Sequence, residues 1–65
     1  MSKHQEIDNR IAYLLSQKPS TFGRLVVHMR DTEWRLIDRR LQAMKKQGRI
    51  KYLGPSLGWG IADHG

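Results

Sequence analysis

The sequence predicts a mainly α domain with a small β-hairpin: helices over about residues 3–18, 21–29 and 32–47, then strands over about 49–53 and 59–62. Three observations lead to this fold class. Apolar residues recur every three to four positions in the first three segments, which is the period of an amphipathic helix. A proline and a glycine stand where two of these segments end. Two short β-prone segments then flank a loop that contains glycine and proline.

Length and composition narrow the class of protein further. With 65 residues the chain fits one small domain, residues 1–65. It has no cysteine, which excludes disulfides and thiolate metal sites. No apolar run approaches the ~20 residues of a membrane span, and the polar start of the chain does not have the pattern of a signal peptide. We therefore expect a cytoplasmic protein without a membrane partner.

The first helix has a single apolar stripe and a clear end. Apolar residues at i, i+4, i+7 and i+8 form one face; they are Ile7, Ile11, Leu14 and Leu15. Ser2 and Gln5 have the spacing of a capping box, and Glu6 and Asp8 are acids that suit the positive end of the helix dipole. Pro19 ends the helix, because the residue before a proline is disfavoured in the α region.

The second helix follows a short extended connection, residues 19–21. Ser20 or Thr21 is expected to cap it, because a side-chain oxygen accepts from the free N–H groups of the first turn. Its buried face is predicted to consist of Phe22, Leu25, Val26 and Met29. The residues Arg30, Asp31 and Thr32 then form the turn before the third helix.

The stretch from Asp31 to Gly48 is predicted to form one helix with two unlike faces. At about 100° per residue, one apolar arc consists of Trp34, Ile37, Leu41 and Met44, and the opposite face consists of Thr32, Arg35, Arg39, Gln42 and Lys46. Asp31 or Thr32 is expected to cap the start. Gly48 suits the left-handed position just past the end. We therefore expect the apolar face to pack on a core and the polar face to contact a polyanion.

The carboxyl-terminal segment is predicted to form a hairpin that packs on the helices, because a lone hairpin is marginal in water. Its inward residues are expected to be Ile50, Trp59 and Ile61, and residues 63–65 are expected to be a frayed tail.

Positive charge is concentrated in one part of the chain. The formal net charge is +6. Residues 30–51 hold eight basic and three acidic side chains, which accounts for +5 of that total. A concentrated basic surface attracts polyanions such as nucleic acid. The alternative is a basic helix face that is merely solvated.

The spacing of core residues resembles a known family. The pattern Ile37-x3-Leu41-x2-Met44-x3-Gly48-x-Ile50, followed by a loop and Trp59-x-Ile61, is similar to that of winged helix-turn-helix DNA-binding domains. The opening of the second helix, Ser20 to Leu25, also looks like theirs. The resemblance implies that the third helix is a recognition helix, that the hairpin is a wing, and that the ligand is double-stranded DNA.

Candidate contacts follow from residue type and place. Basic residues at the end of the third helix and the base of the hairpin suit phosphates; these are Lys45, Lys46, Arg49 and Lys51. Arginine can pair with guanine and glutamine with adenine through two hydrogen bonds, which makes Arg35, Arg39 and Gln42 the candidate base readers. Thr32 could touch a phosphate or a thymine methyl. The alternative for the arginines is a surface salt bridge, such as Arg35 with Asp31.

The sequence also contains residue types that serve other functions. Trp34 and Trp59 could stack on single-stranded bases, but their spacing favours the core. His4, His28 and His64 lack the paired spacing of a metal site. We expect no catalytic, cofactor-binding or metal-binding residues. We predict a transcriptional regulator that acts by occupying a DNA site, with a homodimer possible. The alternatives are a protein-protein interaction module and an RNA or single-strand binder that uses the same basic face.

Overall fold

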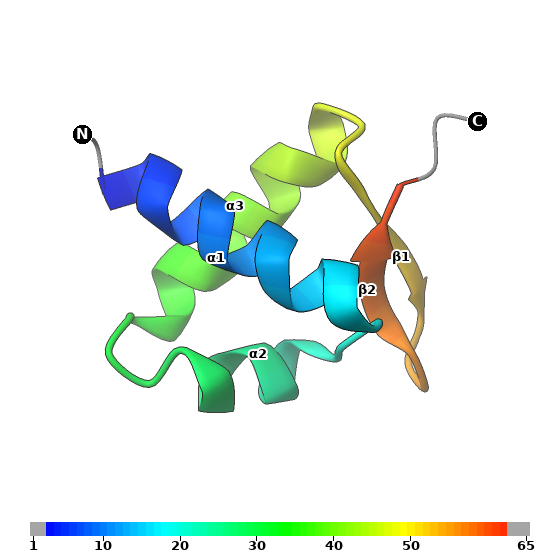
Figure 1. The fold of residues 1–65 in the computed structure, drawn as a ribbon, viewed down its shortest axis with the longest axis horizontal. Coiled ribbons are helices and arrows are strands. Elements are labelled where there is room, and N and C mark those ends of the chain that lie inside the picture. Colours follow the sequence, from blue (N-terminus) through cyan, green and yellow to red (C-terminus); the bar gives the residue numbers. More distant parts are fainter. Residues whose placement is uncertain (1–2, 63–65) are drawn as a thin grey trace.

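The computed structural model describes residues 3–62, which form three helices followed by an antiparallel pair of strands (Figure 1). The elements are α1 (Lys3–Gln17), α2 (Phe22–His28), α3 (Trp34–Lys46), β1 (Ile50–Gly54) and β2 (Gly58–Ile61). The predicted mainly α fold with a terminal hairpin is confirmed at this level. The predicted capping residue Ser2 and the predicted frayed tail, residues 63–65, lie outside the described residues. Within residues 3–62, no helix is both long and apolar enough to cross a membrane.

The core lies where α1 crosses α3, with α2 on one side and the hairpin at one end of α1 (Figure 1). α1 packs on α3 and β2, while α3 also packs on α2 and β1. Burial of apolar side chains at these contacts is the main stabilising term. The buried apolar cluster consists of Ile7, Ile11, Leu15, Leu25, Met29, Ile37, Leu41, Met44, Ile50 and Trp59. In the predicted face of α2, Leu25 and Met29 are buried, and Phe22 and Val26 pack against the cluster while partly exposed.

The connection between α1 and α2 is tied to the hairpin. Ser20 and Trp59 exchange two backbone hydrogen bonds, of 3.0 Å from the Ser20 N–H and 2.7 Å from the Trp59 N–H. Thr21 caps α2, since its Oγ1 accepts from the backbone N–H of Arg24 at 3.3 Å. The extended connection is confirmed, and of the two candidate caps the structure selects Thr21. The bridge fixes β2 beside the helices, so the hairpin does not stand alone.

The start of α3 differs from the expectation. The helix begins at Trp34, after the N-cap residue Glu33, which makes no side-chain capping bond. Asp31 does not cap the helix, because its carboxylate pairs with Arg10 of α1 at 3.0 Å. Thr32 lies in the turn, where its backbone N–H donates to the Met29 carbonyl. The predicted cap by Asp31 or Thr32 is therefore wrong.

The end of α3 follows the prediction. Gly48 has a φ of 76°, in the left-handed region. Its N–H donates to the Lys45 carbonyl, and the Arg49 N–H donates to the Met44 carbonyl, both at 3.0 Å. These two bonds form a Schellman motif, which satisfies carbonyls that the helix itself leaves free. The motif directs the chain from α3 into β1.

The hairpin pairs Ile50 with Ile61 and Tyr52 with Trp59, with a register shift between Tyr52 and Gly54. Ile50 and Trp59 are buried, as predicted. Ile61 is 40% exposed, so its predicted inward position is wrong. Only residues 47–49 join α3 to β1, which holds Ile50 against the helix. Ile61 is the last residue of β2 and lies at the open end of the pair.

Candidate nucleic-acid interface

The outer face of α3 carries a polar stripe, defined as Arg35, Arg39, Gln42 and Lys46. These residues recur at i, i+4, i+7 and i+11, so they fall within an arc of about 60° on a regular helix. All four are exposed. On the opposite side of α3, the side chains that are fully buried are Ile37, Leu41 and Met44. The predicted division of α3 into two faces is confirmed, apart from its first turn.

The cations of the polar stripe are not neutralised by acids. Among residues 3–62, the ion pairs are Arg10–Asp31, Arg40–Asp8 and Arg49–Asp8, and none involves the stripe. The alternative of a salt bridge between Arg35 and Asp31 is wrong, because Asp31 is held by Arg10. The Arg35 guanidinium instead lies over the Trp34 ring, 5.5 Å from its centroid. The stripe is therefore a surface of free positive charge.

Trp34 is the largest departure from the predicted core. It is 55% exposed, although the helical period places it in the apolar arc. The reason is its position as the first residue of α3, one turn before the first buried residue, Ile37. Its aromatic neighbour there is Phe22 of α2, which packs edge-on at 6.5 Å between ring centroids. An open depression next to the ring is lined by Trp34, Arg35, Asp38, Arg39 and Gln42.

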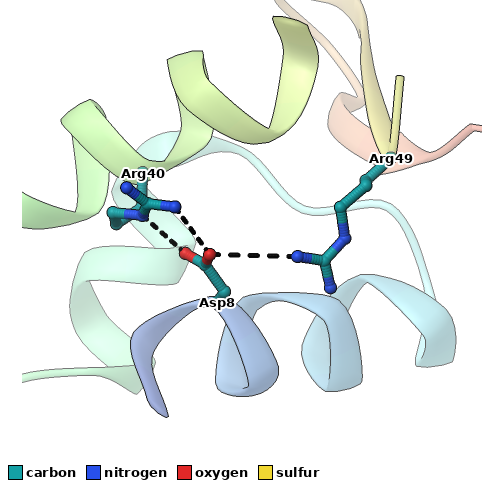
Figure 2. A network of polar contacts seen from close by, with 3 residues as sticks. All are labelled: Asp8, Arg40 and Arg49. Carbon is teal, nitrogen blue, oxygen red and sulfur yellow. Dashed lines mark hydrogen bonds and ion pairs between the residues drawn. The ribbon is translucent and has the colours of Figure 1, made fainter. Parts of the chain in front are cut away.

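A second cluster of charges lies on the side of α3 that faces α1 (Figure 2). Asp8 accepts hydrogen bonds from Arg40 Nε at 2.7 Å and from Arg40 Nη2 at 2.8 Å. The Arg49 guanidinium lies 3.8 Å from the same carboxylate, on its other side. The Asp8 side chain is only 9% exposed and that of Arg40 18% exposed. Asp8 was expected to interact favourably with the positive end of the α1 dipole. It lies beyond the first turn of α1, however, and is buried against α3.

This cluster removes Arg40 from the available positive charge. Hydrogen bonding of the Arg40 guanidinium to the Asp8 carboxylate raises the pKa of Arg40, and this effect exceeds the opposing effect of burial. Arg40 is therefore a fixed cation that already has its counterion. Sequence reasoning missed the pair, but one signal was present. On a helical projection Asp8 falls just beyond Leu15, at the edge of the apolar arc of α1, and a buried carboxylate needs a cation or hydrogen-bond donors.

The structure brings together only some of the predicted contact residues. Arg35, Arg39 and Gln42 line one depression. Lys45 and Lys46 are exposed in the last turn of α3, and Lys51 is exposed on β1. The remaining two predicted contact residues, Thr32 and Arg49, do not lie with the stripe. Thr32 borders a different depression, which also includes Ile7 and Arg10 of α1, and Arg49 reaches back to Asp8.

Comparisons and a search for metal ligands add no competing assignment. Over the described part of the chain, no cluster of three or more histidine, cysteine or acidic residues is placed to hold a metal ion; His64 lies outside that part. Searches against known protein families, curated proteins and solved structures give no match. The candidate site is therefore defined by its own geometry: an unneutralised basic and polar stripe on an exposed helix face.

Proposed function

We propose that this chain is a winged-helix domain that binds double-stranded DNA, with α3 as the recognition helix and the hairpin as the wing. The observation that carries the proposal is the polar stripe. Three cations and a glutamine line the exposed side of a helix whose other side is buried, and none of the three pairs with an acid among the described residues. Such a surface is suited to a polyanion that offers hydrogen-bonding edges.

The order of elements supports the winged-helix assignment. α2, a turn at residues 29–33, and α3 form a helix-turn-helix, and β1 and β2 follow at once. The bridge between Ser20 and Trp59 holds the hairpin against the start of α2. These backbone hydrogen bonds give the hairpin a defined position relative to the helices. It can therefore contact the DNA backbone beside the groove that α3 enters.

The dimensions and chemistry of α3 fit the major groove. A helix with its side chains is about 10–12 Å across, and the major groove of B-DNA is about 12 Å wide. Arg35 and Arg39 have the donors to bond O6 and N7 of guanine, and Gln42 can bond N6 and N7 of adenine. Lys45, Lys46 and Lys51 are exposed cations that contact phosphates and so fix the position of the helix without reading bases.

The cluster around Asp8 supports this function indirectly. Arg40 lies on the side of α3 that faces α1, so its bond to Asp8 restrains the rotation of α3 about its own axis. Rotation of the helix would turn the stripe away from the groove. Asp8 and Arg40 are thus positioning residues.

The domain acts as a transcriptional regulator by occupying its DNA site.

Selection from a pool of randomised duplexes tests the proposal. The wild-type protein is expected to enrich a defined sequence. Arg39→Ala is expected to relax the preference at one base pair and to weaken binding by about 1–3 kcal/mol, because it removes one base contact. Lys18→Ala, which removes an exposed cation at the end of α1, is the matched control and should leave the selected sequence unchanged. If the wild-type protein enriches no sequence and does not retain duplex, the proposal is wrong.

A further inference from the structure

Trp34 is exposed beside the polar stripe, yet recognition of base edges in a duplex has no use for its ring face. We propose that Trp34 and the depression beside it bind a single unpaired nucleobase. The chain would then bind duplex DNA that carries an unpaired base more tightly than continuous duplex. The inference rests on the proposed function only for the contacts to the flanking duplex, whereas the base site itself depends on Trp34 and its neighbours.

The ring is held in place before any ligand arrives. Phe22 packs against it at an interplanar angle of 84°, and Phe22 itself packs on the core cluster. Even with this contact and that of Arg35, Trp34 remains 55% exposed. A restrained and exposed ring loses little conformational entropy on binding. This is the property of a stacking platform for a base.

Charge beside the ring matches a nucleotide. The Arg35 guanidinium lies 5.5 Å from the ring centroid, so a base that stacks on the remaining ring surface brings its phosphate close to a cation. The stacked base is also near arginine and indole together, a combination that adds cation–π attraction. The site therefore offers contacts to both the base and the backbone.

The lining of the depression matches the edge of a base. Asp38 is an acceptor, Arg39 is a donor, and the Gln42 amide is both. At a bulge, Arg39 and Gln42 would bond the unpaired base in place of the base pairs that they contact in continuous duplex. Bases in a continuous duplex are stacked on both faces and paired along one edge. Only an unpaired base can offer a ring face to Trp34 and its pairing edge to these side chains. This is why the occupant is assigned as an unpaired nucleobase.

The test compares three labelled DNAs: a continuous duplex, the same duplex with one bulged adenine, and the same duplex with one bulged abasic nucleotide. The two bulged DNAs carry the same charge and differ only in the base. We expect the wild-type protein to bind the adenine bulge about tenfold more tightly than the abasic bulge, the size that one base–aromatic stack allows. The difference should vanish in Trp34→Ala and persist in Tyr13→Ala, which removes an exposed aromatic from α1.

Tryptophan fluorescence gives a second readout. Trp59 is buried, so quenching that the adenine bulge produces and the abasic bulge does not should come from Trp34 and be absent in Trp34→Phe. Equal affinity of the wild-type protein for both bulges, or a difference that survives Trp34→Ala, would overturn the inference. If the adenine bulge binds and continuous duplex does not, the duplex-binding proposal fails and the nucleobase site stands. If none of the three DNAs binds, both are wrong.

Discussion

Asp8 of α1 and Arg40 of α3 form two hydrogen bonds, of 2.7 and 2.8 Å, across the interface between the helices (Figure 2). The two residues are 32 positions apart in the sequence. A paired, largely buried carboxylate contributes little net stability compared with apolar packing. Loss of one partner, however, leaves the other charge buried without a counterion. We therefore expect the pair to contribute to how α1 and α3 are oriented more than to the net stability of the fold.

Breaking the pair should destabilise the protein. In Asp8→Ala the Arg40 guanidinium keeps its charge and loses its buried counterion, so we expect a clear drop in Tm by circular dichroism. The double variant Asp8→Leu with Arg40→Met should recover most of the loss, because the apolar pair leaves no buried charge unpaired. Arg49, which also faces Asp8, has a side chain that is 44% exposed and can be solvated. A double variant no more stable than Asp8→Ala would show that the pair is not energetically coupled.

The ion pair between Arg10 and Asp31 is a matched comparison on the surface. The distance between the Arg10 guanidinium and the Asp31 carboxylate is 3.0 Å, similar to the distances between Asp8 and Arg40. The side chains of Arg10 and Asp31, however, are 46% and 72% exposed. Exposed pairs contribute about 0–1 kcal/mol. Asp31→Ala should therefore change the free energy of unfolding, measured with urea, by no more than that amount. A loss as large as that of Asp8→Ala would contradict the difference in burial.

Gly58 and Gly23 should respond in opposite directions to alanine. A Cβ on Gly58, where φ is +79°, would lie 2.3 Å from the Ser20 carbonyl oxygen, so the bridge between Ser20 and Trp59 must shift. The left-handed backbone alone costs about 1–2 kcal/mol, and we expect at least that loss in the free energy of unfolding. Gly23 in α2 has no atom within 4 Å of a built Cβ, so Gly23→Ala should stabilise by about 0.4–1 kcal/mol.

Much of the fold could be predicted because its signals are local. The period of apolar residues placed α1 and the buried side of α3, Pro19 marked the end of α1, and Gly48 marked the end of α3. The start of α3 could not be predicted in the same way. Asp31 and Thr32 were the predicted caps, but Glu33 takes the N-cap position. Asp31 pairs instead with Arg10, and that contact exists only in the folded chain.

In the candidate site, too, some features could be predicted from local sequence signals and others could not. The exposure of Arg35, Arg39 and Gln42 followed from the helical period. The exposure of Trp34 did not, because the period says which way a side chain points and not whether another element covers it. The role of Arg40 also depended on a distant residue, Asp8. Counting charges therefore overstated the cations available on this segment.

The two tryptophans should differ in their access to solvent. Trp34 is 55% exposed and Trp59 is 7% exposed. Acrylamide should quench one fraction of the fluorescence readily and the other weakly, and Trp34→Phe should remove the readily quenched fraction. If Trp34→Phe leaves the accessible fraction in place, the position of Trp34 at the surface is wrong.

Lys46 and Arg39 should have different effects on DNA binding. Lys46→Ala removes a proposed phosphate contact, so we expect equally weaker binding to all sequences and a slope of log affinity against log salt that is smaller by about 1. The measurement is a salt titration of the variant against two unrelated duplexes. Loss of affinity for only one of the duplexes would instead assign Lys46 to base reading.

The most direct test of duplex binding is the fluorescence anisotropy of a labelled duplex titrated with this protein at about 50 and 200 mM salt. With at least the three phosphate contacts proposed for Lys45, Lys46 and Lys51, log affinity should fall with log salt at a slope near −0.9 per contact, or about −3 or steeper in total. Affinity should then drop by about fortyfold or more between these salt concentrations. No binding at the lower salt, or binding that does not change with salt, would contradict the proposal that the basic face of α3 binds DNA.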